Sequence, residues 1–148
     1  MGYKLIALDI DGTLLNSSNQ ITENVKEAIR KSKEKGVKVV LCTGRPLKGV
    51  ENFLDELNLK EEGDYVSTFN GALVQDAHTG KPISHLTLDY EDLCDLYDLS
   101  VEVGSRSHFY DTRTVYTFNR DGSEYTSLEA YLTGVHLNVT EVDEVPKD

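Results

Sequence analysis

Two short apolar segments, separated by a helical pattern, constrain the fold of this chain more than any other feature. Residues 4–9 and 37–42 are runs of strand length, rich in Leu, Ile and Val. Between them, Val25, Ala28 and Ile29 recur at helical spacing. A strand, a helix and a second strand in this order form a right-handed unit in which the two strands are parallel. The pattern predicts a parallel sheet of buried strands covered by helices.

The alternation continues into a third strand and then changes character. A helix over 47–57 and a strand over 65–69 complete a β-α-β-α-β pattern. From about residue 84 the pattern predicts an α+β region, because hairpin strands and helices no longer follow the β-α-β alternation. The later elements expected are hairpin strands at 73–74 and 83–88, a helix from an Asp89 N-cap to about Val103, strands at 108–110 and 115–118, a turn at 119–122, a short helix over 127–132, and a strand or tail over 137–145.

The charge balance excludes several classes of function. The chain carries 15 Lys and Arg against 26 Asp and Glu, a formal net charge of −11, so it lacks the cationic surface that binds nucleic acid or an anionic membrane. Its apolar runs fall far short of the roughly 20 residues of a membrane span, and its N-terminus shows no signal-peptide pattern. Cys42 and Cys94 are far apart, so no disulfide framework is expected. We therefore expect a cytoplasmic protein that binds a small molecule through locally placed groups.

The first expected helix, with Thr22 as its predicted N-cap, carries a run of basic residues. Cations crowd its outer face and last turn, at Lys26, Arg30, Lys31, Lys33 and Lys35. Such a run could bind an anion, but cations near a helix C-terminus are typical of a solvated face. We interpret it as a solvated helix face.

A pair of carboxylates follows the first strand directly. The segment Asp9-Ile10-Asp11-Gly12-Thr13 lies at the carboxyl end of that strand, where open α/β sheets bind their ligands. Paired carboxylates there suit a divalent cation, or a nucleophile beside an acid/base group. The alternative is an ordinary turn in which an Asp caps a loop. The placement after an apolar strand favours a functional site.

Polar residues also follow the second and third strands. Thr43-Gly44-Arg45 supplies a hydroxyl, backbone N–H groups and a cation, which together suit phosphate oxygens. Asn70-Gly71 adds a polar side chain and a permissive turn after the third strand. Since the carboxyl ends of neighbouring parallel strands share one edge of a sheet, these residues and Asp9 are expected to converge. The convergence predicts a phosphate site.

These motifs together resemble the haloacid dehalogenase superfamily, and more narrowly its Cof-like sugar-phosphate phosphatases. The resemblance is carried by the segments Asp9-Ile10-Asp11-Gly12-Thr13-Leu14-Leu15, Thr43-Gly44-Arg45 and Phe69-Asn70-Gly71-Ala72. It implies an α/β fold: a Rossmann-like parallel sheet core, here incomplete, over residues 1–83. It also implies that residues 84–148 are the start of an α+β cap domain of the C2 type.

The resemblance further implies a reaction. A magnesium-dependent phosphatase would hydrolyse a small phosphorylated metabolite, a sugar phosphate, through an aspartyl-phosphate intermediate. Asp9 would be the nucleophile and Asp11 the general acid/base, and both would contribute to the Mg²⁺ site. Phosphate or substrate would contact a set of residues on the three strand ends: Gly12, Thr43, Gly44, Arg45 and Asn70.

The chain also departs from the family's pattern. The family uses a later Lys and a later acidic motif that completes the Mg²⁺ site, and neither is recognisable after residue 84. We therefore expect the chain to be part of a longer enzyme and to be inactive alone. The alternatives are a phosphotransferase or phosphomutase of the same superfamily, and a non-catalytic phosphate- or metal-binding fragment. A phosphorylation-receiving signalling domain is disfavoured, because it needs its acceptor Asp where this chain has Asn70. The sequence indicates neither the individual substrate nor an oligomeric state.

Overall fold

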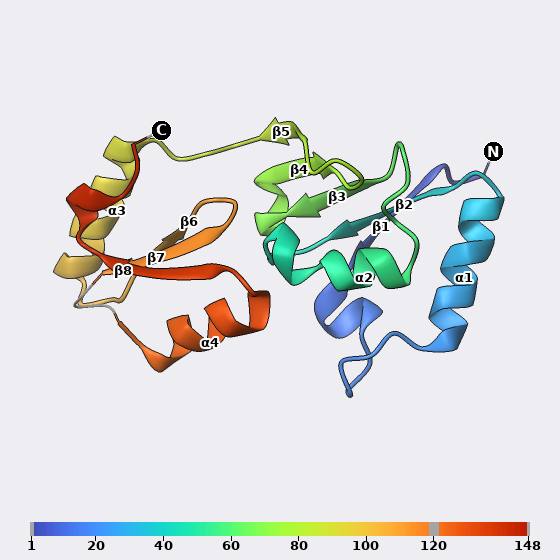
Figure 1. The fold of residues 1–148 in the computed structure, drawn as a ribbon, viewed down its shortest axis with the longest axis horizontal. Helices are drawn as coiled ribbons and strands as arrows, with labels where there is room; N and C mark the ends of the chain where they lie inside the picture. The colour runs from blue at the N-terminus through green and yellow to red at the C-terminus, as the bar shows by residue number, and fades with distance from the viewer. Residues whose placement is uncertain (1, 119–121, 148) are drawn as a thin grey trace. The chain divides into compact units, whose positions relative to one another are not determined.

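A computed structural model describes residues 2–118 and 122–147 of the protein. The chain forms two compact units, Met1–Leu86 and Thr87–Asp148. Figure 1 shows the fold of both. The first unit carries all the candidate site residues named above.

The first unit is built on a five-stranded sheet. Its strands lie in the order β1-β2-β3-β4-β5 (Figure 1). Strands β1, β2 and β3 are parallel to one another, and β4 is antiparallel to both β3 and β5. The strands are β1 (Leu5–Asp9), β2 (Lys38–Cys42), β3 (Tyr65–Thr68), β4 (Leu73–Asp76) and β5 (Pro82–His85). Helix α1 (Glu23–Glu34) connects β1 to β2, and α2 (Glu51–Glu56) lies between β2 and β3. The expected α/β class is therefore confirmed.

One apolar core holds this unit together. It joins the sheet to both helices through Ile29 of α1, Leu54 of α2, Leu41 of β2 and Val66 of β3, and it also contains Ile10. Full burial of a Leu, Ile or Val side chain contributes about 1.5–3 kcal/mol. Such burial fixes the strand ends relative to the helices.

Two local expectations for this unit are wrong. The first strand was expected to be buried, but β1 pairs only with β2 among the described strands, and Leu5 is 55 % exposed. The helix expected over 47–57 is a short 3₁₀ turn, Leu47–Gly49, followed by α2; the two are separated by Val50, whose φ of −130° is not helical. Thr22 is the N-cap residue of α1, as expected, although its side chain makes no capping hydrogen bond.

The second unit has its own sheet and helices. Its strands β6 (His108–Tyr110), β7 (Thr114–Phe118) and β8 (His136–Thr140) lie in that order, with β6 and β7 antiparallel and β7 and β8 parallel. Helices α3 (Tyr90–Glu102) and α4 (Glu124–Thr133) accompany them. Asp89 caps α3 as expected, accepting from the N–H of Asp92. Helix α4 begins earlier than expected because Ser123 caps it.

The remainder of this unit agrees in part with the sequence patterns. The segment expected as a strand or tail forms β8 and then a 3₁₀ turn, Val142–Glu144. The expected turn at 119–122 lies largely outside the described residues. Assignment of the unit as the start of a cap stays a prediction. No helix within 2–118 and 122–147 has the length and apolar character needed to cross a membrane.

Candidate active site

The turn after β1 displays two carboxylates because the residues around them are buried. Ile10 and Leu14 are 0 % and 5 % exposed and lie in the core, whereas Asp9 and Asp11 are exposed. Gly12 has a φ of +77°, in the left-handed region that favours glycine. The buried side chains of Ile10 and Leu14 therefore hold the turn against the core, while both carboxylates stay at the surface.

Asp9 is tied to its own turn. The hydroxyl of Thr13 donates to Oδ2 of Asp9 at 3.1 Å, and the N–H of Leu15 closes the segment by donating to the carbonyl of Ile10 at 3.1 Å. In the parallel pairing of β1 and β2, Asp9 lies opposite Cys42. The next residue along β2 is Thr43, so the two motifs start side by side at one edge of the sheet.

Thr43 connects the turns after β2 and β3. It is only 5 % exposed, and its N–H donates to the carbonyl of Ser67 at 3.0 Å. Its hydroxyl oxygen accepts from the N–H of Arg45 at 3.1 Å, and its carbonyl accepts from the N–H of Asn70 at 2.9 Å. These bonds bring the second and third motifs together, as their positions at strand ends predict.

Asn70 packs directly on Gly44. Phe69 and Asn70 have φ values of 51° and 56°, so two consecutive non-glycine residues adopt the left-handed conformation. A Cβ atom on Gly44 would lie 2.9 Å from Oδ1 of Asn70 and 3.3 Å from its Nδ2. A side chain at position 44 would therefore require the Asn70 amide to shift, a relationship that no sequence pattern identified.

Arg45 faces Asp11. Its Nε donates to Oδ2 of Asp11 at 2.9 Å, and its Nη2 donates to Oδ1 at 2.6 Å. Its Nη1 makes a longer contact, 3.4 Å, with the carbonyl of Gly49, and its Cζ lies 5.7 Å from the ring centroid of Phe53. The sequence pattern indicated a cation at this edge of the sheet but did not identify Asp11 as its partner.

Asp9 and Asp11 offer the oxygen donors that Mg²⁺ uses. This hard cation takes oxygen ligands and is usually held by one or two carboxylates together with water and substrate phosphate. The carboxylate of Asp9 and the backbone carbonyl of Asp11 would supply such oxygens at one turn. The residues present therefore fit a Mg²⁺ site of the open type.

Cys42 lies beside the carboxylates but is not activated as a nucleophile. Burial raises the pKa of its thiol, and the charge of Asp9 raises it further, while a hydrogen bond with Ser67 acts in the opposite direction. The net upward direction keeps the thiol protonated at neutral pH. Cys42 is a half-buried free thiol of β2.

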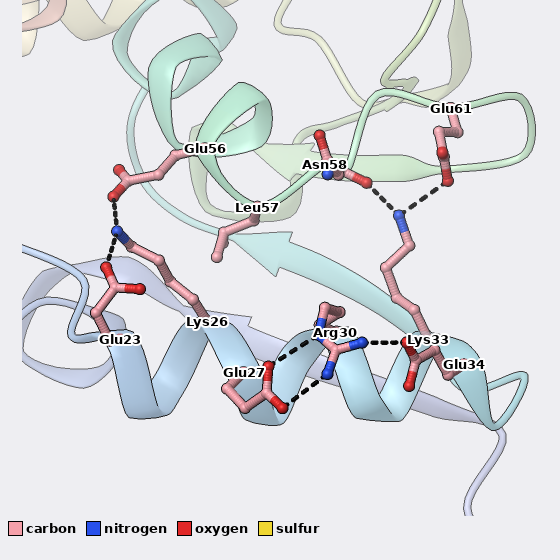
Figure 2. A pocket seen from close by; sticks show the side chains of 10 residues that line it. All are labelled: Glu23, Lys26, Glu27, Arg30, Lys33, Glu34, Glu56, Leu57, Asn58 and Glu61. Atoms are coloured by element: carbon pink, nitrogen blue, oxygen red, sulfur yellow. Dashed lines mark hydrogen bonds and ion pairs between the residues drawn. The ribbon is translucent and has the colours of Figure 1, made fainter.

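The basic helix forms a separate hollow with the segment after α2 (Figure 2). Its cations are paired with carboxylates: Lys26 lies 2.6 Å from Glu23 and 2.9 Å from Glu56, and Lys33 lies 3.1 Å from Glu61. Arg30 lies 2.7 Å from Glu27. Ten residues line the hollow: Glu23, Lys26, Glu27, Arg30, Lys33, Glu34, Glu56, Leu57, Asn58 and Glu61. Because these ion pairs neutralise the basic run, the hollow is a solvated helix face and a poor anion site.

Comparison with known proteins agrees with this geometry. The family model described as haloacid dehalogenase-like hydrolase matches residues 6–147. The chain therefore belongs to the haloacid dehalogenase-like hydrolases, as its motifs suggest.

Individual relatives cover nearly all of the chain. The Bacillus subtilis protein YxeH is 57 % identical over 146 residues, which are 99 % of this chain and 54 % of YxeH. Phosphatase YwpJ of Bacillus subtilis is 33 % identical over 129 residues, 85 % of this chain and 42 % of that protein. A haloacid dehalogenase-like hydrolase from Bacteroides thetaiotaomicron has a crystal structure that superposes with a TM-score of 0.80 at 28 % identity, covering 99 % of this chain and 56 % of that one. The chain thus spans about half the length of the curated relatives it matches.

Proposed function

We propose that the protein is a phosphatase that hydrolyses a small phosphate monoester through a phosphorylated Asp9. The observation that carries this proposal is the hydrogen-bonded convergence of three strand ends: Asn70 bonds to Thr43, Thr43 bonds to Arg45, and Arg45 bonds to Asp11. Asp9 begins the turn that contains Asp11. The residues that we propose as nucleophile, acid/base group and phosphate donors therefore lie on one sheet edge.

The first chemical step transfers the phosphoryl group to Asp9. A carboxylate oxygen of Asp9 bonds to phosphorus as the ester P–O bond breaks. Protonated Asp11 gives its proton to the departing oxygen, so the alcohol leaves neutral and Asp11 becomes a carboxylate. The products of this step are the alcohol and aspartyl-phosphate at position 9.

The second step restores the enzyme. The carboxylate of Asp11 takes a proton from water, whose oxygen bonds to phosphorus as the bond to the Asp9 oxygen breaks. Inorganic phosphate leaves, Asp9 is again a carboxylate, and Asp11 is again protonated. One water is consumed for each ester hydrolysed.

The surrounding residues hold the phosphoryl group. The hydroxyl of Thr43 and the amide of Gly44 lie in the turn beside Asp9 and donate to phosphate oxygens. The turn at Gly12 lets the backbone approach, and Asn70 closes the far side of the turn against Gly44. Mg²⁺, which Asp9 and Asp11 would hold, supplies charge neutralisation between the carboxylates and the phosphate.

The physiological setting follows from the family and from composition. A sugar phosphate is the substrate class that the Cof-like resemblance implies, and phosphatase YwpJ supports phosphate-ester hydrolysis as the reaction. We place the protein in the cytoplasm because its two cysteines, Cys42 and Cys94, are both free thiols.

The test is hydrolysis of p-nitrophenyl phosphate by the full-length protein in Mg²⁺. We expect Mg²⁺-dependent release of nitrophenolate and a loss of at least about a thousandfold in kcat for Asp9→Asn, since the amide cannot act as the nucleophile. Lys48→Gln, an exposed site paired with Glu51, is the matched control and should keep wild-type turnover. Turnover that survives Asp9→Asn would rule out the assignment of the nucleophile.

A further inference from the structure

Within the proposed function, on which this step rests, we propose that Arg45 is a positioning residue for Asp11 rather than a phosphate ligand. Two nitrogens of its guanidinium meet the two oxygens of Asp11, at 2.9 and 2.6 Å. Such a planar fork fixes both the position and the orientation of a carboxylate. The group that transfers protons in the reaction is therefore oriented by a side chain of the second strand's motif.

Arg45 is the better-fixed member of the pair. Its side chain is 28 % exposed, whereas that of Asp11 is 57 % exposed. Its N–H donates to the hydroxyl oxygen of Thr43, its Nη1 contacts the carbonyl of Gly49 at 3.4 Å, and its guanidinium lies over the Phe53 ring. Asp11 lies on an exposed turn beside a glycine. Because Arg45 is held by the segment between β2 and α2, its ion pair restricts the position of Asp11, the proposed acid/base group.

The same contacts disfavour a role for Arg45 in binding phosphate directly. Three of its five side-chain N–H donors are already engaged, two on Asp11 and one on Gly49. A phosphate that used the fork would have to displace the carboxyl group of Asp11, whose orientation the fork would then no longer fix. Thr43 and Gly44 remain the proposed phosphate donors.

The two roles predict different dependence on the leaving group. A nitrophenolate departs readily without a proton, whereas an alkoxide needs one, so misorientation of a general acid slows alkyl esters selectively. Loss of a phosphate ligand slows both esters alike, because both carry the same phosphoryl group. Lysine separates the roles further: it keeps the positive charge that attracts phosphate but cannot form the bidentate fork.

The experiment compares benzyl phosphate with p-nitrophenyl phosphate, two esters of similar shape, using the full-length protein and kcat/KM. For Arg45→Lys and Arg45→Gln we expect a loss of about 10–100-fold with benzyl phosphate and less than about threefold with p-nitrophenyl phosphate. In an Asp11→Asn background, Arg45→Lys should add less than about twofold, because a residue that acts through Asp11 has nothing left to orient. Lys48→Gln removes a nearby cation paired with Glu51 and should leave both values unchanged.

Equal losses for the two esters in Arg45→Gln would overturn the proposal and assign Arg45 to the phosphate. Wild-type values for both esters in Arg45→Lys would overturn it as well and assign Arg45 to neither role. The ratio of the two kcat/KM values is independent of how much of a variant is folded, so partial unfolding does not obscure the result. If the wild-type protein hydrolyses neither ester, the proposed function fails and the role of Arg45 fails with it. If it hydrolyses both and the ratio is unchanged, only the role of Arg45 fails.

Discussion

The hydroxyl of Thr13 donates a 3.1 Å hydrogen bond to Oδ2 of Asp9, four residues earlier in the chain. The bond fixes one oxygen of the proposed nucleophile against the turn that it begins. A hydrogen bond to a charged group contributes about 1.5–3 kcal/mol. Its removal should leave the Asp9 carboxylate less well oriented, and the rate of hydrolysis should fall. We expect Thr13→Val to lower kcat/KM about tenfold with p-nitrophenyl phosphate, and Thr13→Ser, which keeps the donor, to stay within about twofold of wild type. Equal activity in Thr13→Val and wild type would show that this bond does not orient Asp9.

The contact between Gly44 and Asn70 predicts a coupled pair of substitutions. In Gly44→Ala the new Cβ would lie 2.9 Å from Oδ1 of Asn70, so the amide must move, and we expect the free energy of unfolding to fall by about 1–3 kcal/mol. Asn70→Gly removes the obstacle and tolerates the φ of 56° at that position. In the Asn70→Gly background, Gly44→Ala should cost less than about 0.5 kcal/mol. Denaturant unfolding of the four proteins measures this coupling, and additive losses would contradict it.

The buried hydroxyl of Thr43 predicts a stability effect separate from catalysis. Thr43→Val keeps the shape but removes the oxygen that accepts from the N–H of Arg45. Because the N–H of Arg45 is only partly buried, its loss of an acceptor should cost about 1 kcal/mol, the lower end of the range for buried groups, in the free energy of unfolding. Thr43→Ser keeps the acceptor and is the control for the missing methyl group. A Val variant more stable than the Ser variant would mean that the hydrogen bond contributes little here.

Tyr110 of β6 predicts a pH dependence for the second unit. Three causes together raise the pKa of Tyr110 to about 12: burial of the ring hydroxyl, the charge of Glu129, and the hydrogen bond between the two side chains. The unfolded chain then loses the tyrosine proton at a lower pH than the folded chain, so the contribution to stability is complete below about pH 10 and declines as the pH rises towards 12. Tyr110→Phe should lose stability less steeply over this window in denaturant unfolding at stepped pH. Parallel curves for the two proteins would contradict the assignment.

The sequence predicts the positions of the strand ends better than their surroundings. Apolar runs and helical spacing place Asp9, Thr43 and Asn70 after three successive strands, and parallel pairing alone then brings them to one edge. The edge position of β1 could not be predicted from the sequence. An apolar run such as Leu5–Leu8 indicates that a strand can be buried, but it does not indicate whether the strand has one neighbour or two.

The finer site geometry also needed the structure. Arg45 and Asp11 are 34 residues apart in sequence, and only the register of β1 against β2 brings their turns into contact. The close approach of the Asn70 amide to Gly44 occurs at a residue with a left-handed φ of 56°. Neither relationship has a local sequence signal, since each joins two motifs from different strands.

The central claim is that Asp9 carries the phosphoryl group during turnover. The most direct measurement is acid quenching of the full-length protein during hydrolysis of a radiolabelled phosphate ester, followed by peptide mapping. We predict label on the peptide that contains Asp9, sensitive to hydroxylamine as an acyl phosphate, and no label in Asp9→Asn. Label on another residue, or turnover by Asp9→Asn at the wild-type rate, would contradict the account.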